Sequence, residues 1–579
     1  MNKKLFWIVL IPALFVIGVY LFVRYSLQSS VWRGGEKISN VAGDTSSQMK
    51  TTALDLRPLF LERLQQLVAK TSNDIYNVSV DSMTVDVLAS RVSFQKVVLT
   101  PDNKRADSLS KLGLAPAETF SFSFDKLEVE GINLDDAITQ KTMDYKLVKL
   151  TRPVFHIYQA PNDTADPKED FSRRFLKEMD KLSVKQLLIV DGKVIIHNKG
   201  KSTTLNDVYI DMKNILIDSV TRTDPKRFLF ANSASINFKN YKVAMTGGDY
   251  NLSVGKVNVE APEQKVTLTN VSFSPPIDKK QFAGRQKVSR EYYNLSLPSV
   301  TINAVNWWSL LNQNEVDASQ VNINGGKLFI YLDRSLPRAS KMGNFPAQLL
   351  MKLPTKINID RMRLNNVDLA YEEFNPLSQQ SGTIHIRDVS MNITNVSNTP
   401  AKALRPVTVR GGGLLMGKVP LTANFSFSRE KYKSGSFTAR INSTSVFEGS
   451  LINSFAIPMG LIKIERGLIK RITADIKGDE LQASGDITVL YSDIKLGLLE
   501  KDKGKKKLDK KSVTSFLANA VVLKKDNPRQ GEAPRKVQAA FTRVPEGGFF
   551  LLVWKTMLTG ALKTLGAPTK IATKSVSDN

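Results

Sequence analysis

A period of two in hydrophobicity constrains this chain more than any other feature of its sequence. From about Tyr76 onward, apolar side chains alternate with Ser, Thr, Asn, Asp and Lys in short segments that Gly, Pro and Asn interrupt. Clear examples are Phe120–Phe124, Val389–Ile393 and Leu421–Phe427. Successive side chains of a β-strand point to opposite faces, so each segment has one apolar and one polar face. The pattern predicts a mainly β protein with a largely antiparallel sheet that buries one side.

Helical patterns are few. Apolar residues recur at helical spacing in Leu54–Lys70, Lys168–Leu182 and Ser512–Leu523. A helix of this length hides an apolar stripe only by packing it against another element. We therefore expect these segments to cap the sheet.

An internal repeat divides the β-rich region. Val184–Val194 resembles Val321–Phe329 and Ile357–Leu369, and Leu205–Ile215 matches Ile386–Val396 in its Asp-Val dipeptide. The matching phrases lie roughly 175 to 180 residues apart, which is the signature of a repeated structural unit. We predict two related β modules, at residues 75–290 and 291–500.

The N-terminus predicts a membrane anchor. Residues 1–4 form a short tail with Lys3 and Lys4, and residues 5–23 are nineteen uncharged, mostly apolar residues bounded by Arg24. Such a run approaches the ~30 Å hydrocarbon core of a bilayer, and the two lysines favour a cytoplasmic N-terminus. A cleaved signal peptide is the alternative, although no Ala-x-Ala-like site follows the run. Residues 24–74 are expected to form a juxtamembrane helical linker.

Residue types restrict the chemistry of this chain. It contains no cysteine, which excludes thiol catalysis, disulfides and cysteine-ligated metals, and which suits an oxidising compartment. The three histidines, His156, His197 and His385, each adjoin an isoleucine in an alternating stretch and lack metal-ligand spacing. We interpret them as ordinary strand residues.

One segment imitates a nucleotide-binding loop. Gly412–Lys418 matches the first seven positions of the phosphate-binding pattern, but Val419 stands where the motif needs Ser or Thr, and an alternating strand follows instead of a helix. No paired carboxylates or nucleophile elbow occur elsewhere. We predict a protein that is not an enzyme and that has no cofactor and no metal.

The charge of the chain is strongly positive, at +26, with a dense lysine run at residues 501–511. We expect residues 501–548 to comprise a lysine-rich loop, a helix and a terminal β segment. A basic chain suits nucleic acid or anionic lipid, but an exported chain does not meet nucleic acid and it lacks an aromatic, basic recognition motif. Phospholipids are therefore the expected partners.

An amphipathic helix is predicted at residues 549–566, near the C-terminus, followed by a disordered tail at 567–579. It is too short to span a bilayer, and its apolar side carries aromatic residues that favour an interface. We predict that it contacts a membrane, or a protein embedded in one, through six residues: Phe549, Phe550, Trp554, Lys555, Met557 and Lys563. The alternative is that the helix docks on the core of this protein.

The chain resembles a known family. Its architecture, together with Val489–Asp502 and the later pattern Phe549-Phe550-x-x-x-Trp554-Lys555-x-x-x-x-Gly560-x-x-Lys563, is similar to the AsmA-like family of Gram-negative envelope proteins. The resemblance implies a bridge-like lipid transfer architecture. In that architecture an N-terminal transmembrane helix in the inner membrane carries an elongated, curled β-sheet with a hydrophobic groove in the periplasm. It also implies phospholipid transport towards the outer membrane, although this chain is short for the group.

Two functions follow from these expectations. The first is conduction or shuttling of phospholipid along a β-groove, since acyl chains would cover an apolar sheet face that few helices hide. The alternative is a non-enzymatic assembly or scaffold factor of the envelope that acts through protein–protein contacts. The predicted groove residues, which would form a core if the sheet were a closed sandwich, are Phe120, Phe122, Phe124, Val389, Met391, Ile393, Phe425 and Phe427.

Overall fold

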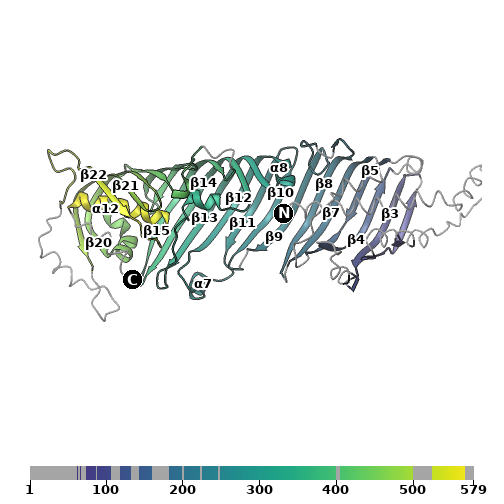
Figure 1. Ribbon diagram of the computed structural model, residues 1–579, viewed down its shortest axis with the longest axis horizontal. Coiled ribbons are helices and arrows are strands. Elements are labelled where there is room, and N and C mark those ends of the chain that lie inside the picture. The colour runs from purple at the N-terminus through teal and green to yellow at the C-terminus, as the bar shows by residue number, and fades with distance from the viewer. Residues whose placement is uncertain are drawn as a thin grey trace, which may run out of the picture. The chain divides into compact units, whose positions relative to one another are not determined.

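The fold is known from a computed structural model (Figure 1). It describes, apart from a few single positions, residues 74–86, 88–102, 118–131, 142–159, 181–198, 201–221, 224–245, 248–399, 405–499 and 524–566. Several predicted segments lie wholly or mostly outside these residues: the membrane helix at 5–23, the linker at 24–74, the helices at 168–182 and 512–523, the lysine-rich run at 501–511 and the tail at 567–579.

The chain divides into two compact units. The first comprises residues 1–243, 254–267 and 307–314, and the second comprises residues 244–253, 268–306 and 315–579. The sequence placed the boundary between the modules at residues 290 and 291. In sequence the units interleave over residues 244–314, because β10 (Asn251–Glu260) and β11 (Lys265–Ser274) contribute residues to both.

Among the elements whose bounds the structure describes, the first unit contains strands and the short helix α8 (Trp307–Asn312). Its strands are β1 (Tyr76–Ser79), β2 (Ser82–Asp86), β3 (Arg91–Pro101), β4 (Glu118–Glu130), β5 (Thr142–Thr151), β6 (Val154–Gln159), β7 (Lys181–Asn198), β8 (Lys201–Ile217) and β9 (Ser233–Ala244). β1, β2 and β4 pair with β3 in antiparallel fashion, and β7, β8 and β9 pair in chain order, also antiparallel. β5 and β6 each pair with β4 in antiparallel fashion and with β7 in parallel fashion.

The second unit contains most of the helices that the structure describes: α7 (Lys279–Gly284), α9 (Pro346–Met351), α10 (Asn453–Gly460), α12 (Phe549–Leu565) and the 3₁₀ turns η3 (Tyr432–Ser434) and η4 (Gly449–Ile452). Its strands are β12 (Tyr292–Val305), β13 (Glu315–Asp333), β14 (Lys356–Asn375), β15 (Gln380–Ser397), β16 (Val407–Leu415), β17 (Val419–Phe427), β18 (Phe437–Ser443), β19 (Phe447–Glu448), β20 (Ile462–Gly478), β21 (Gln482–Leu498) and β22 (Val537–Thr542). Among the described residues these strands pair in antiparallel fashion, except that β13 and β14 run parallel.

The prediction of a mainly β fold is confirmed, and most of the described strand pairs are antiparallel, but the sheet is mixed because it also contains parallel pairs. β5 and β6 run parallel to β7, and β13 runs parallel to β14. A parallel neighbour needs a connection of roughly a dozen residues or more, and residues 334–355 between β13 and β14 provide one that includes α9. Alternation has the same period in both arrangements, so it did not reveal the parallel pairs.

The internal repeat corresponds to a repeated bulge in long strand pairs. Asp207 and Asp388, the aspartates of the two matching Asp-Val dipeptides, have φ of 49° and 52°. The valines that follow, Val208 and Val389, are 2% and 1% exposed and face β7 and β14 at a register shift. In both places the strand opposite the bulge also has a parallel neighbour: β7 pairs with β5 and β6, and β14 pairs with β13. The two phrases therefore build the same local structure.

These bulges change the phase of the alternation within a strand. In β15 the apolar-face residues are even-numbered before Asp388, as in Ile384 and Ile386, and odd-numbered after it, as in Val389 and Met391. β14 makes the same change at Asn366, whose φ is 55°, from the even-numbered Leu364 to the odd-numbered Val367. Because both strands insert a residue at the same level, their apolar side chains remain on one face.

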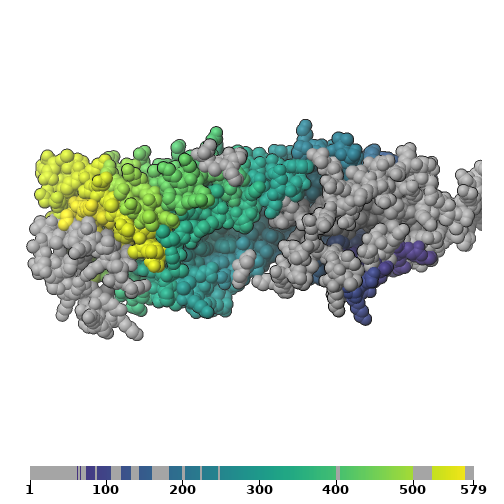
Figure 2. All heavy atoms as spheres, in the orientation of Figure 1, coloured from purple at the N-terminus to yellow at the C-terminus, as the bar shows by residue number. Residues whose placement is uncertain are grey.

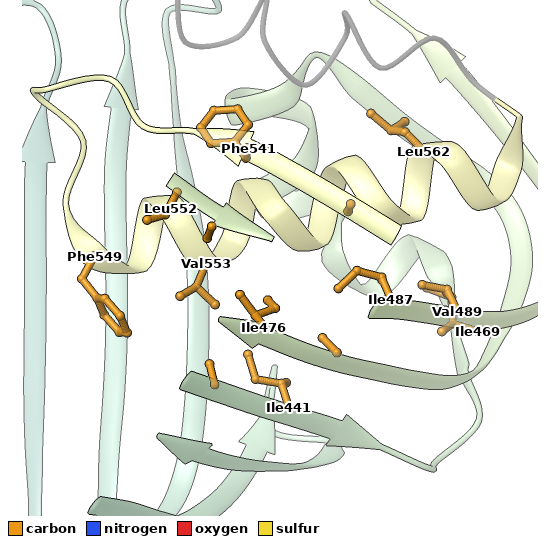
Figure 3. Close-up of a cluster of buried hydrophobic side chains, with 14 of the residues drawn as sticks. Ile441, Ile469, Ile476, Ile487, Val489, Phe541, Phe549, Leu552, Val553 and Leu562 are labelled. Atoms are coloured by element: carbon orange, nitrogen blue, oxygen red, sulfur yellow. The ribbon is translucent and has the colours of Figure 1, made fainter. Parts of the chain in front are cut away.

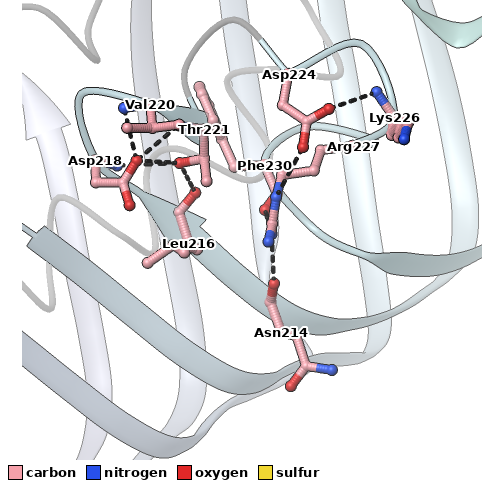
Figure 4. Close-up of polar contacts among 9 residues, drawn as sticks. All are labelled: Asn214, Leu216, Asp218, Val220, Thr221, Asp224, Lys226, Arg227 and Phe230. Carbon is pink, nitrogen blue, oxygen red and sulfur yellow. Dashed lines mark hydrogen bonds and ion pairs between the residues drawn. The ribbon is translucent and has the colours of Figure 1, made fainter.

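A hydrogen-bonded loop follows β8 in the first unit (Figure 4). The Asp218 carboxylate accepts a hydrogen bond of 2.6 Å from the Thr221 backbone N–H, and the Arg227 guanidinium donates to the carbonyl oxygens of Asn214 and Phe230 at 3.0 and 2.9 Å. These bonds satisfy backbone groups at the end of the strand. We therefore assign this polar cluster a structural role.

The bulge makes a stability prediction. Asp388→Val should destabilise the second unit by about 1–2 kcal/mol, since a β-branched residue is disfavoured at positive φ, whereas Asp388→Gly should be neutral or stabilising. Asn392→Val, an exposed site in the same strand without a positive φ, is the control and should be tolerated. Denaturant unfolding measures all three. Equal effects of valine at 388 and 392 would contradict the role assigned to the bulge.

Candidate functional site: an apolar sheet face and its helix

Strand register places apolar side chains in continuous rows on one face of the second unit. Directly paired residues of neighbouring strands lie on the same face of a sheet. Two rows run from β12 to β22, each residue paired with the next. The first is Ile302, Val321, Met362, Ile393, Val409, Phe425, Ala439, Ile476, Gly485 and Ala539. The second is Val300, Ile323, Leu364, Met391, Gly411, Ala423, Ile441, Ala474, Ile487 and Val537. We call them together the apolar face.

The opposite face is polar at the same positions along the strands. The paired residues there are Thr301, Asn322, Arg363, Asn392, Arg410, Asn424, Arg440, Asp475, Asp486 and Gln538. Arg440 and Asp475 form an ion pair whose side chains are 73% and 57% exposed. Such an exposed pair adds little stability, so this face is a solvated surface and the structural energy of the sheet comes from the other side.

Burial changes along the apolar face. At its β20–β22 end the side chains are buried, with Ile476 at 3%, Ile487 at 0% and Ala539 at 1% exposed. In β14 to β17 the corresponding side chains are only half-buried: Met362, Leu364, Met391, Ile393, Val409, Ala423 and Phe425. The apolar face is therefore sealed at its β20–β22 end and partly open to solvent in β14–β17.

The helix α12 seals this end (Figures 1 and 3). It packs on β20, β21 and β22, and Leu552, Val553 and Leu562 are at most 4% exposed. A Cβ atom on Gly560 would lie 2.5 Å from the Ile487 side chain, so only glycine allows this close approach. In Figure 2 the yellow atoms of this segment lie directly against the green atoms of the preceding strands.

An aromatic cluster fixes the start of α12. The Phe549 ring lies 4.9–5.9 Å from the rings of Phe345, Phe425, Phe427 and Phe437, with interplanar angles of 63–81°. Edge-to-face pairs of this kind contribute about 0.5–1.5 kcal/mol each beyond burial. The first turn of the helix is thus tied to β17 and β18 as well as to the terminal strands.

The predicted membrane-contact residues divide between the two sides of α12. Phe549 and Lys555 are 5% and 4% exposed, so in this docked position neither side chain is available to a membrane. Trp554 and Met557 are half-buried, and Trp554 lies 5.7 Å from the Phe455 ring. The Lys563 ammonium donates to the Gln538 carbonyl at 2.9 Å, and Phe550 is 73% exposed. The sequence identified the helix but not which side of it docks on the sheet.

Lys555 carries an unusual electrostatic environment. Its pKa is lowered to about 8, first by burial and then by the nearby Arg334 cation, while Glu373 acts in the opposite direction. Arg334 and Glu373 form an ion pair of 3.2 Å whose side chains are about one-tenth exposed. The pKa of Tyr371, which donates a hydrogen bond to Glu373, is raised well above its usual value, first by burial and then by this carboxylate. A small set of buried charges therefore lies against α12.

The predicted groove residues all lie on apolar positions. Met391, Ile393 and Phe425 belong to the half-buried rows, Val389 is 1% exposed, and Phe427 is 5% exposed beside Phe549. In the first unit, Phe122 and Phe124 are 5% and 2% exposed, and Phe120 stacks on Tyr76 with ring centres 5.5 Å apart. They adjoin a fully buried row of six paired side chains: Phe94, Leu127, Leu150, Ile189, Ile210 and Ile236.

The structure also places the two remaining candidates from the sequence, the loop-like segment Gly412–Lys418 and the histidines. Gly412–Lys418 spans the end of β16 and the turn into β17, a strand–turn–strand hairpin without a phosphate-binding helix. Within the described residues no group of three or more His, Asp or Glu side chains is placed to hold a metal. His156 and His197 are nevertheless adjacent, with Nδ1 and Nε2 3.1 Å apart, an arrangement that their separation in sequence did not reveal.

Comparison of the chain with protein-family models and with curated proteins finds no match. In the part of the chain that the structure describes, none of the helices has the length and hydrophobicity needed to cross a membrane.

The buried lysine predicts a pH dependence. An ordinary lysine titrates near pH 10.4, so between about pH 8 and 10.4 the unfolded chain binds more protons at this site than the folded protein. The penalty of burying the charge is therefore complete below pH 8 and disappears as the pH rises. Lys555→Met should stabilise the second unit by roughly 2–3 kcal/mol at pH 7 and by much less at pH 10.

Denaturant midpoints at the two pH values test this, and Lys563→Met on the same helix is the control. A destabilising Lys555→Met whose effect does not change with pH would show that the favourable contacts of the ammonium group outweigh the penalty of burying it.

Proposed function

We propose that the apolar face of the second unit binds the acyl chains of phospholipids and that the protein carries or conducts them without chemical change. The half-burial of the rows in β14–β17 supports this most directly. Soluble proteins rarely leave large contiguous apolar areas uncovered, and such areas mark binding sites. An acyl chain supplies what these side chains lack, since it removes apolar area from water and needs no hydrogen bonds.

Location and direction are part of the same proposal. The uncharged segment at residues 5–23 and the resemblance to the AsmA-like family favour an anchor in the inner membrane, a periplasmic β region and transport towards the outer membrane. The positive charge of +26 favours contact with anionic lipid surfaces. A scaffold that binds proteins through the same face is the competing function.

Adjacent residues of β15 provide a matched test of lipid binding. Met391 lies half-buried on the apolar face between Leu364 and Gly411, whereas Asn392 is exposed on the polar face between Arg363 and Arg410. We expect Met391→Glu to lower the phospholipid that co-purifies with the protein at least severalfold and Asn392→Glu to leave it unchanged. Lipid extraction and mass spectrometry measure the amount, and the melting temperature reports on folding.

Three outcomes separate the possibilities. Lipid loss with a retained melting temperature supports an open face, because the new carboxylate reaches water. Unfolding of Met391→Glu would show a closed core, in which the charge is buried without a partner. A folded wild-type protein that carries no phospholipid would favour the scaffold function.

We also propose that α12 contacts a membrane, but only through the side chains that remain exposed when the helix is docked, such as Phe550. Phe550→Ser should weaken binding to anionic vesicles while leaving the melting temperature unchanged, since this side chain is 73% exposed. Phe549→Ser should instead destabilise the unit by about 3 kcal/mol or more, because a buried aromatic cluster would lose its centre. Vesicle co-sedimentation and thermal unfolding distinguish the two. Unchanged vesicle binding by Phe550→Ser would remove this residue from any membrane contact.

A further inference from the structure

Among the described residues, β22 lies at an end of the sheet, since it pairs with β21 alone (Figure 1). The direction of its hydrogen bonds follows from the next residue, because the Arg543 N–H donates to the opposite Leu481 carbonyl at 2.8 Å. In an antiparallel pair, every second residue directs both its N–H and its C=O at the partner strand. Val537, Ala539 and Phe541 therefore bond to β21, and the residues between them point their backbone groups outward.

The outward-facing residues are Gln538, Ala540 and Thr542, whose side chains are exposed on the polar face. The Lys563 ammonium donates to the Gln538 carbonyl at 2.9 Å, which agrees with an outward direction for that carbonyl. Within the described part of the chain, the other outward N–H and C=O groups of the three residues have no hydrogen-bond partner. This side of β22 is an open strand edge.

The edge lacks the features that usually prevent a further strand from adding to it. Proteins protect open edges with charged side chains, prolines or bulges. Residues 537–542 contain neither a charged residue nor a proline, and their pairing with β21 has no register shift. Lys563 covers a single carbonyl. The open ladder groups are the groups that bind an added strand.

We propose that a second copy of this chain adds its own β22 to this edge, in antiparallel fashion, with Ala540 of the two copies opposite each other. The interface is then two-fold symmetric, and Gln538 of one copy faces Thr542 of the other. All of these residues direct their backbone groups outward, so the two strands form hydrogen-bonded pairs along the interface.

The side chains favour a second copy over an unrelated strand. At the symmetry axis two Ala540 methyl groups meet, so no bulky group separates the backbones. Gln538 and Thr542 form an amide–hydroxyl pair on the polar face, while Ala539 stands opposite Phe541, a small residue against a large one. Residues 538–542 carry no charge, so no like charges oppose each other within the pairing.

Lys563 limits the strength of this association. The Ala540 residues exchange hydrogen bonds with each other, and each Gln538 N–H reaches a Thr542 carbonyl, without any change in the protein. Bonds to the Gln538 carbonyls instead compete with the Lys563 ammonium. A six-residue strand also buries less surface than the ~1,600 Å² of a stable interface. We therefore expect a weak dimer that Lys563→Ala tightens.

Cysteine cross-linking of the full-length protein tests the partner and the register, because the chain contains no cysteine of its own. Ala540→Cys should form a disulfide-linked dimer on oxidation, since opposite Cα atoms of a hydrogen-bonded pair lie about 5.5 Å apart. Gln538→Cys is the matched control on the same exposed edge. Its two thiol positions are offset by four residues, roughly 13 Å, and should not cross-link. Combining Gln538→Cys with Thr542→Cys should restore the cross-link.

Ala540→Pro gives a second readout. It removes an outward N–H that β21 does not use, so it should abolish the dimer in sedimentation equilibrium while the melting temperature stays close to that of the wild type. If Ala540→Cys remains monomeric on oxidation, or cross-links no more than Gln538→Cys, the proposal is overturned. Co-purification of a different protein that Ala540→Pro releases would assign the edge to that protein and overturn it as well. The result does not depend on lipid binding.

Discussion

Strand register is the constraint on which the rest of this structure depends. A side-chain period of two means that a slip of one residue in any strand would move its apolar residues to water. The long strands avoid this at their bulges because both partners change phase at one level, at Asn366 in β14 and at Asp388 in β15. Polar residues that tolerate positive φ occupy these points, so the rows of the apolar face remain aligned across strands that bend.

Two parts of the apolar face differ in how far their side chains are covered. At β20–β22 a helix covers the rows, and Gly560 lets it approach closely enough to bury Ile487 completely. In β14–β17 the side chains are only half-buried, which leaves unrealised about 1 kcal/mol for each large apolar residue. A ligand bound as proposed above would recover that free energy, so the incomplete cover would itself be a source of affinity.

The strands, their alternation of apolar and polar residues, the repeated phrases and the helix α12 could be predicted from the sequence, because each depends on residues that are close together in the chain. The broken phase in Ile384–Ile386 and Val389–Ile393 even marks the bulge between them. Other features depend on pairing between distant segments. Neither the parallel neighbours of β7 and β14 nor the meeting of His156 with His197 changes the local alternation. The sequence did not show which side of α12 docks on the sheet. Lysine is normally exposed, but Lys555 is buried in the docked side, so its charge pointed to the wrong side of the helix.

The chemistry of the apolar face also limits what it recognises. The backbone N–H and C=O groups of its central strands are already used in the ladders, so the face offers a ligand side-chain contacts almost exclusively. Dispersion and burial then determine affinity, and these depend on area more than on chemical identity. If the face binds lipid as proposed, acyl chains of different length and saturation should therefore bind similarly along the rows. Selection of a headgroup would then have to come from polar groups at their margins.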